Sequence, residues 1–324
     1  MEVELVTCPL CGAAEAHPLF TGPDRAYGLP GRFQVVRCQR CGLRYLNPRP
    51  TATALRRYYP PSGYYTHAPP HKSHPALARL RHRLAALVLR AHKGYPGQVA
   101  DWVRWLTRPL VPLTGLVPPW REAGRLLDVG CGAGWYLNAM RAWGWRVIGL
   151  ELDQTAVQLA QRASIPILVG DLAAAWPVRA GSFHVVTMWH VLEHLPDPVA
   201  ALKRARQALT PGGLLLLEAP NADSLVAQVL GCYWFHHDLP RHLVAFNPAT
   251  LRRALTEAGF RDVWIRQQPN VNGLAGGLQY WWDERTGQRG SGIYQDPLLR
   301  AVMWLPALLF AWLGRGDCLR AVAR

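Results

Sequence analysis

Residues 126–134 read Leu-Leu-Asp-Val-Gly-Cys-Gly-Ala-Gly, and they carry the clearest structural signal in the chain. The apolar first half predicts a buried strand over 125–129, and the glycines predict a tight turn that opens a helix over 134–143. Glycine lets the backbone approach a ligand closely, and the free N–H groups at a helix start favour a carboxylate or a phosphate. Loops of this G-x-G-x-G kind also occur in NAD sites, so the neighbouring residues must decide which cofactor is bound.

The alternation of strand and helix continues beyond this loop. Further strands are predicted over 146–151, 167–169, 183–188, 214–219 and 262–266, and further helices over 154–163, 198–209 and 248–258. A last strand is predicted over 317–323, after a Gly-rich stretch and an apolar helix. This order is typical of an α/β fold built on a parallel sheet.

Two acidic residues follow the second and third strands of this sheet. Glu151 ends the second strand, where a carboxylate can accept hydrogen bonds from both hydroxyls of a ribose. Asp171 follows the third strand, where a carboxylate can accept from an adenine amino group. The spacing therefore indicates a nucleoside-containing cofactor at the carboxyl ends of the strands.

Five ordered motifs resemble those of class I S-adenosylmethionine-dependent methyltransferases: LLDVGCGAG (126–134), the acid of GLELD (149–153), GDL (170–172), FHVVTMWHVLEHLPDP (183–198) and LTPGGLLLLEAPN (209–221). The resemblance covers about residues 123–268 and implies a Rossmann-like sheet. It implies that Asp128 and the glycine loop hold the methionine moiety, Glu151 the ribose, and Asp171 with Leu172 the adenine. The predicted cofactor-binding set is Asp128, Gly130, Cys131, Gly132, Gly134, Glu151, Leu152, Asp171, Leu172, Trp189 and His190.

The N-terminal region holds two C-x-x-C-G pairs, Cys8 with Cys11 and Cys38 with Cys41. Two residues between thiolates let one turn place both sulfurs on a tetrahedral ion, so we expect a structural zinc site. Redox dithiols are the alternative, but no thioredoxin-like βαβ pattern surrounds the pairs. The segments VRCQRCGLRYLNPRPT (36–51) and DLPRHLVAFNPATLRRALTEAGF (238–260) resemble the zinc-knuckle branch of the methyltransferase family, which is associated with sugar and cell-surface glycan modification.

Histidines cluster where an acceptor should bind. His190, Glu193 and His194 spell H-x-x-E-H, but they follow a buried strand directly and do not lie on the long helix that a metalloprotease uses. Glu193 and His194 either hold a divalent ion or orient the loop under the cofactor. After the fifth strand, 233–242 is the expected acceptor wall: His237 is the predicted general base, with His194 and His242 as further catalytic candidates, and Arg241 could pair with an anionic acceptor.

The flanks of the sheet are basic and apolar. Lys and Arg number 36 against 21 Asp and Glu, a net charge of +15, which favours anionic partners. Leucines recur at helical spacing from Leu77 among arginines, and 298–313 forms an apolar segment with Trp304 and Trp312. Either the two flanks pack together as a lid over the site, or they contact a membrane surface.

We expect three regions: a zinc ribbon at 1–50, a helical cap or linker at 51–122, and a methyltransferase domain at 123–324 with an apolar helical insertion at about 269–314. The N-terminus is not a signal peptide, so we expect a cytoplasmic enzyme, with peripheral contact to the inner membrane surface as an option. The expected acceptor is a sugar hydroxyl or carbon, nucleotide- or lipid-linked. The alternatives are an RNA methyltransferase guided by the zinc ribbon, with nucleic acid the weaker expectation, and a non-catalytic cofactor-binding scaffold.

Overall fold

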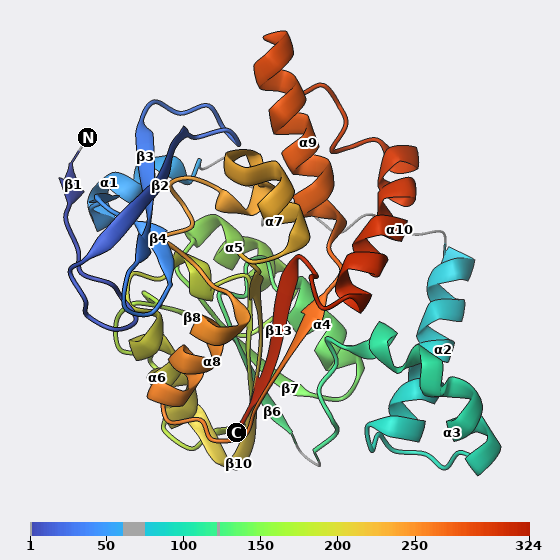
Figure 1. The fold of residues 1–324 in the computed structure, drawn as a ribbon. Coiled ribbons are helices and arrows are strands. Elements are labelled where there is room, and N and C mark those ends of the chain that lie inside the picture. Colours follow the sequence, from blue (N-terminus) through green and yellow to red (C-terminus); the bar gives the residue numbers. More distant parts are fainter. Residues whose placement is uncertain (1, 61–74, 122–123) are drawn as a thin grey trace.

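A computed structural model describes residues 2–60, 75–121 and 124–324, and its centre is a seven-stranded sheet (Figure 1). The strand order is β12-β13-β10-β9-β6-β7-β8. These strands span β6 (Arg125–Val129), β7 (Arg146–Glu151), β8 (Ile167–Val169), β9 (Phe183–Trp189), β10 (Leu209–Pro220), β12 (Val263–Gln268) and β13 (Cys318–Ala323). The predicted α/β Rossmann-like fold is confirmed.

The sheet is parallel except at one place. Strands β10, β9, β6, β7 and β8 run parallel, and the last strand of the chain, β13, inserts antiparallel between β10 and β12. The insertion brings the loop before β13 next to the carboxyl end of β10, where Pro220 pairs with Cys318. Residues from the far C-terminus therefore line the same edge as the residues that follow β9.

Helices cover both faces of the sheet, which explains why its strands read as nearly continuous apolar runs. On β6, Leu127 and Val129 join a core with α6 (Pro198–Ala208) and α8 (Pro248–Glu257). Leu126, the residue before Leu127, faces the opposite core with α4 (Trp135–Ala142) and α5 (Gln154–Arg162). Asn247 caps α8 through a reciprocal hydrogen-bond pair with Thr250, as expected from the Asn-Pro start.

The N-terminal region forms a second sheet that is completed by a distant segment. Its order is β11-β4-β3-β2, with β2 (Ala16–Pro23), β3 (Arg32–Cys38), β4 (Arg44–Leu46) and β11 (Val244–Ala245). A small pair, β1 (Val3–Glu4) and β5 (Arg49–Pro50), precedes the short helix α1 (Ala52–Leu55). Because β11 follows the predicted acceptor wall, the N-terminal sheet is joined to that wall by main-chain hydrogen bonds.

The flanking helices lie to one side of the sheet (Figure 1). One pair is α2 (Pro75–His92) with α3 (Asp101–Thr107), and the other is α9 (Val271–Thr286) with α10 (Pro297–Trp312). The short helix α7 (Leu225–Leu230) packs on α9. Helix α2 packs mainly on α3 and 108–114, and α10 packs mainly on α9. In the described residues, most large apolar side chains of both flanks are exposed, and neither α2 nor α3 has an extensive contact with α9 or α10. The choice between a lid and a membrane surface stays a prediction. Residues 61–74 and 122 of the expected cap lie outside the described residues.

Candidate active site

The glycine loop after β6 has the conformation that its sequence requires. Gly130, Gly132 and Gly134 all have positive φ, at 67°, 53° and 78°. A Cβ on Gly130 would lie 2.5 Å from Val191 Cγ2, so no side chain fits there. Gly134 caps α4 without a side-chain hydrogen bond, which leaves the N–H groups of the first turn free for a carboxylate.

Glu151 is held rigidly at the end of β7. One carboxylate oxygen accepts from the Gly132 N–H at 2.8 Å, and the other accepts from Leu152 and Asp153 at 2.8 and 2.9 Å. These bonds tie the second strand to the glycine loop. A carboxylate fixed in this way presents its remaining lone pairs in one direction, as the recognition of a ribose requires.

Asp128 is buried on β6, two residues before Gly130. Thr187 on β9 donates a hydrogen bond to its carboxylate at 2.6 Å. Burial raises the pKa of Asp128 to about 7, and the nearby Glu151 adds to the rise. A buried carboxylate with so high a pKa is suited to receive a cation, because the cation would restore the charged form.

The remaining cofactor candidates lie at the ends of the next strands. Leu152 is exposed beside Glu151, Leu172 is half-buried, and Asp171 uses one oxygen to accept from the Ala173 N–H at 2.8 Å. Cys131 is buried, and burial raises the pKa of its thiol, so it offers no free thiolate. Its sulfur packs against Gly149, where an added Cβ would lie 2.4 Å away. These residues fit S-adenosylmethionine. Asp128 and Glu151 offer polar groups for its methionine and ribose moieties, and Leu152 and Leu172 offer apolar side chains for its adenine.

Trp189 ends β9, and the next residue, His190, has a strained backbone with φ 54°. Its Nδ1 lies 3.2 Å from Glu193 and its Nε2 lies 3.4 Å from Glu218 on β10. Although burial opposes it, hydrogen bonds with Cys318, Glu193 and Glu218 raise the pKa of His190 well above its usual value. The contacts of His190 with these two carboxylates therefore favour its protonated form, which is less suited to act as a general base.

Among the described residues, two groups of side chains at this edge of the sheet could hold a metal ion: His190 with Glu218 and Cys318, and Glu193 with His194 and His242. Atoms of Glu193, His194 and His242 lie within 4.8 Å of one another. Although burial opposes it, the hydrogen bond from His190 lowers the pKa of Glu193 to about 2, and its Oε2 is buried without a partner. His242 donates from Nδ1 to the His236 carbonyl at 2.7 Å, and burial lowers its pKa to about 4. The geometry is compatible with the divalent site considered for Glu193 and His194.

His236 and His237 lie on one 3-10 turn, Phe235–His237, and point to different neighbours. His237 donates from Nε2 to the Gly231 carbonyl at 3.1 Å and packs on Phe20, and burial lowers its pKa to about 3. His236 places Nε2 3.3 Å from Asp317 Oδ2, and its ring lies parallel to the His190 ring at 6.1 Å. The general-base role of His237 stays a prediction. The histidine that lies next to a carboxylate is the preceding residue, His236, beside Asp317.

Arg241 does not contact an acceptor, and that expectation is wrong. Its side chain is 0% exposed and pairs with Asp24 at 2.7 Å and with Asp238 at 2.7 Å. It also donates to the Tyr58 carbonyl at 3.0 Å. Because Asp24 follows β2, Arg241 joins the acceptor wall to the N-terminal sheet.

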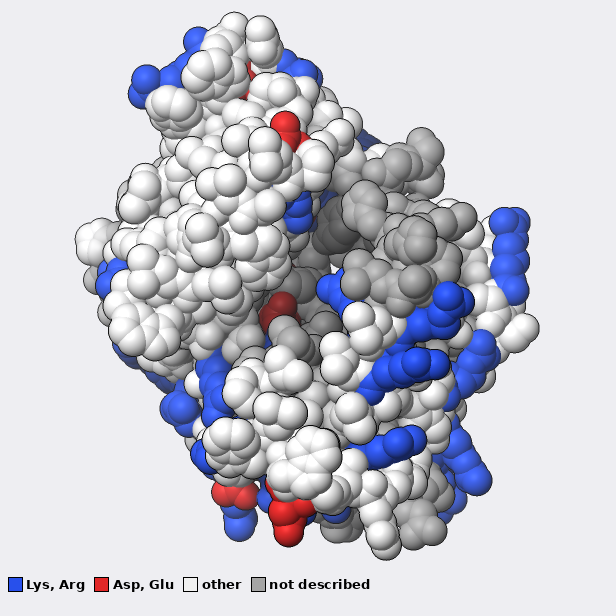
Figure 2. All heavy atoms as spheres, turned by 90° about the vertical axis from the view of Figure 1, so that its right-hand side faces the viewer, with Lys and Arg blue, Asp and Glu red and all other residues white. Residues whose placement is uncertain are grey.

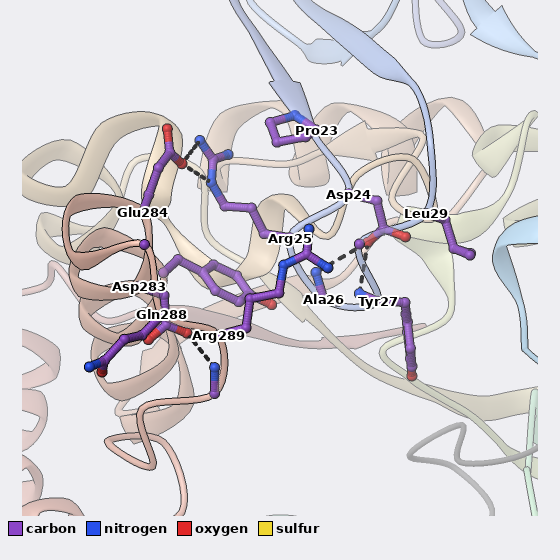
Figure 3. A pocket seen from close by; sticks show the side chains of 14 residues that line it. Pro23, Asp24, Arg25, Ala26, Tyr27, Leu29, Asp283, Glu284, Gln288 and Arg289 are labelled. Atoms are coloured by element: carbon purple, nitrogen blue, oxygen red, sulfur yellow. Dashed lines mark hydrogen bonds and ion pairs between the residues drawn. The ribbon is translucent and has the colours of Figure 1, made fainter.

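A cavity of about 430 Å³ opens on the other side of this wall, between residues 23–29 and the end of α9 (Figure 3). Arg25 and Glu284 approach each other from opposite walls and form an ion pair at 2.9 Å. None of the cofactor candidates lines the cavity. Tyr280 lines it and also borders a smaller hollow next to His237, so the cavity lies on the acceptor side of the molecule.

The four N-terminal cysteines converge. Sγ atoms of Cys8 and Cys41, and of Cys11 and Cys38, are 3.5 Å apart, and all four lie within 4.8 Å of one another. Sulfurs bound tetrahedrally at about 2.3 Å lie about 3.8 Å apart, so the donor set fits one zinc ion. In each knuckle the glycine has positive φ and its N–H bonds back to the first cysteine's carbonyl.

The central sheet and the glycine loop with Glu151 are the features expected of a methyltransferase domain. A sequence model of the methyltransferase domain family matches residues 71–264, more than half of the chain. The chain therefore belongs to the class I S-adenosylmethionine-dependent methyltransferase family.

Similar proteins include ubiquinone biosynthesis O-methyltransferases. That of Thiobacillus denitrificans is 33% identical over 150 residues, 42% of this chain and 63% of the relative, and that of Xanthomonas axonopodis pv. citri is 34% identical over 152 residues, 42% and 62%. The chain thus spans less than two thirds of these relatives. A solved S-adenosylmethionine-dependent methyltransferase from Archaeoglobus fulgidus is 20% identical with a TM-score of 0.45, covering 69% of this chain and 93% of that one.

Sequence reasoning missed the residues that surround His190. Glu218 and Cys318 are on neighbouring strands, and Asp317 and His236 come from segments 81 residues apart. The acid in LLLLEAPN was one available signal, because it ends a strand at the cofactor edge. Asp317 carried no such signal, since only the antiparallel insertion of β13 brings it to the site.

Proposed function

We propose that the enzyme is an O-methyltransferase, with His236 and Asp317 as the pair that removes the proton from an acceptor hydroxyl. The observation that carries this proposal is the contact between His236 Nε2 and Asp317 Oδ2, at 3.3 Å and nearly without solvent exposure. The names of the similar ubiquinone biosynthesis O-methyltransferases support an oxygen acceptor.

Asp317 is suited to orient this histidine. Its Oδ1 accepts from Ser224 at 2.7 Å and from Trp234 Nε1 at 2.8 Å, so only Oδ2 remains for His236. His236 Nε2 and Asp317 Oδ2 lie 3.3 Å apart, and both atoms are buried without a hydrogen-bond partner. A proton on Nε2 would therefore lie beside the carboxylate and leave the Nδ1 lone pair of His236 to accept the proton of the acceptor. When bound, S-adenosylmethionine supplies an electrophilic methyl group on a sulfonium. The acceptor oxygen would lose its proton to His236 as it bonds to that methyl carbon, while the bond between the methyl carbon and sulfur breaks and S-adenosylhomocysteine leaves.

For the acceptor we propose a sugar hydroxyl of a nucleotide- or lipid-linked glycan. The support is the resemblance of the cysteine knuckles and of 238–260 to the sugar-modifying branch. It is strengthened by the contact of the N-terminal sheet with the acceptor wall, through the β4–β11 pairing and the Arg241–Asp24 ion pair. We further propose that the four cysteines bind one structural zinc ion that stabilises this sheet.

The test is methyl transfer from labelled S-adenosylmethionine to nucleotide sugars, polyprenyl-phosphate sugars and hydroxylated ubiquinone precursors. Transfer to oxygen of a sugar supports the proposal, and transfer confined to the ubiquinone precursors overturns the glycan acceptor. His236→Gln should lower kcat about 10²–10⁴-fold with unchanged cofactor affinity. His237→Gln is the matched variant: if it alone abolishes turnover, His236 is not the base.

A further inference from the structure

Helix α10 exposes an apolar surface of unusual extent. Nine large apolar side chains of α10 and of the residue after it are exposed: Leu298, Leu299, Val302, Trp304, Leu305, Leu308, Leu309, Trp312 and Leu313. Leu305 is 72% and Trp312 82% exposed, while Ala307 is the buried residue of the helix. Scattered apolar side chains are normal at a surface, but a contiguous set of this size marks an interaction site.

The surface continues on the helices that share this side of the molecule. Trp102, Trp105 and Leu106 of α3 and Leu80 and Leu84 of α2 are exposed as well. Figure 2 views this side and shows a broad area almost without charged side chains, with many Lys and Arg and a few Asp and Glu around it. The site is therefore an apolar face with a basic margin.

The charge of this side is strongly one-sided. Arg79, Arg81, Arg83, Arg90, Arg104 and Arg108 are exposed on α2, α3 and the turn that follows. Asp101 is the one acidic residue among 79–121 and 297–313 together. Two copies of the chain meeting here would bring these cations together, whereas an anionic surface would neutralise them.

The helices of this face are suited to lie on a lipid surface, and not to cross it. No helix in the described part of the chain has the length and apolarity to cross a membrane, and α10 has 16 residues. An apolar, Trp-bearing helix beside exposed arginines is suited to lie in the plane of a bilayer interface, with its side chains among the acyl chains and the cations at the headgroups.

We propose that α10, together with the exposed residues of α2 and α3, docks the enzyme on an anionic lipid bilayer. The proposal does not depend on the identity of the acceptor. The C-terminal end of α10 is connected to the site by a short segment: Leu313 lies four residues before Asp317. Four residues reach at most about 14 Å, so docking would hold the acceptor side of the site near the lipid surface.

The experiment is flotation of the full chain with vesicles of phosphatidylcholine alone and with vesicles that also contain about 30 mol% phosphatidylglycerol. The second lipid is anionic and gives the vesicles a negative surface charge. The native chain should float with the anionic vesicles, and less so in 1 M salt, where the Debye length is about 3 Å. The paired variant Leu305→Ser with Trp312→Ser should weaken binding at least about tenfold, because it removes two large apolar groups that docking would bury in the bilayer.

The matched control is Leu5→Ser with Trp264→Ser, which changes the same residue types at exposed positions outside these helices. It should bind vesicles like the native chain, and both variants should bind S-adenosylhomocysteine normally, which shows that they fold. Absent flotation of the native chain, or equal loss in both paired variants, would overturn the proposal. A native dimer that the α10 variant alone converts to a monomer would assign the surface to a second copy and overturn it too.

Discussion

The pKa of Asp128 predicts that cofactor binding depends on pH. In the free enzyme burial raises this pKa to about 7, so near neutrality the carboxyl is protonated about half of the time. The family resemblance places the methionine moiety beside Asp128, and that moiety carries an ammonium group. An ammonium favours the ionised carboxylate, so binding below pH 7 must release a proton.

The expected magnitude follows from the ionised fraction of Asp128. With a free-enzyme pKa of about 7, that fraction is about 0.03 at pH 5.5 and about 0.75 at pH 7.5. If only the ionised form binds the ammonium well, affinity rises roughly 25-fold across this range. The direction is fixed by the sign of the shift: a carboxyl with a raised pKa is charged, and able to pair, only as pH increases past that pKa.

Titration calorimetry with S-adenosylhomocysteine between pH 5.5 and 7.5 measures this rise, and buffers of different ionisation enthalpy count the protons released. The matched ligand is 5′-methylthioadenosine, which keeps adenine and ribose but lacks the ammonium, so its affinity should stay nearly constant. Asp128→Asn should remove the pH dependence of the first ligand. A flat profile for S-adenosylhomocysteine, or the same slope for both ligands, would refute the reasoning.

Three further predictions concern single residues. Glu151→Ala should weaken S-adenosylmethionine binding by about 1.5–3 kcal/mol in calorimetry, since it removes hydrogen bonds to a charged group, and tight NAD binding instead would contradict the cofactor assignment. Cys38→Ser should release about one zinc per chain in metal analysis and unfold the N-terminal sheet, and full zinc retention would argue against the four-thiolate site. Arg241→Ala should lower the free energy of unfolding in urea by about 3–5 kcal/mol, because it leaves Asp24 buried without its cation. The exposed pair of Arg253 with Glu257 serves as control, where Arg253→Ala should cost less than about 1 kcal/mol.

Most strands of the central sheet could be predicted to within two residues of their ends, because buried parallel strands alternate with amphipathic helices whose caps are visible in the sequence. The exception is β10, which begins at Leu209, five residues before its predicted start. Helix α9 could not be separated from its surroundings, because Gly273, Gly276 and Gly277 look like turn signals. In the structure they are the contact face of the helix. A Cβ on Gly273 would lie 1.7 Å from Asp317, and one on Gly276 would lie 2.2 Å from Phe235. These glycines allow α9 to lie directly against the proposed catalytic pair.

The choice between His236 and His237 shows where sequence reasoning stops. The two residues are adjacent in a 3-10 turn, where each step rotates the side chain by about 120°, so one histidine can face the sheet while the next faces the N-terminal module. Which one faces which side depends on the end of α9 and on the strand order, and neither is a local property. Asp317 then distinguishes them physically, since its carboxylate, fixed by Ser224 and Trp234, lies 3.3 Å from the ring of His236. The last strand of the chain therefore contributes to the proposed chemistry as directly as the glycine loop contributes to cofactor binding.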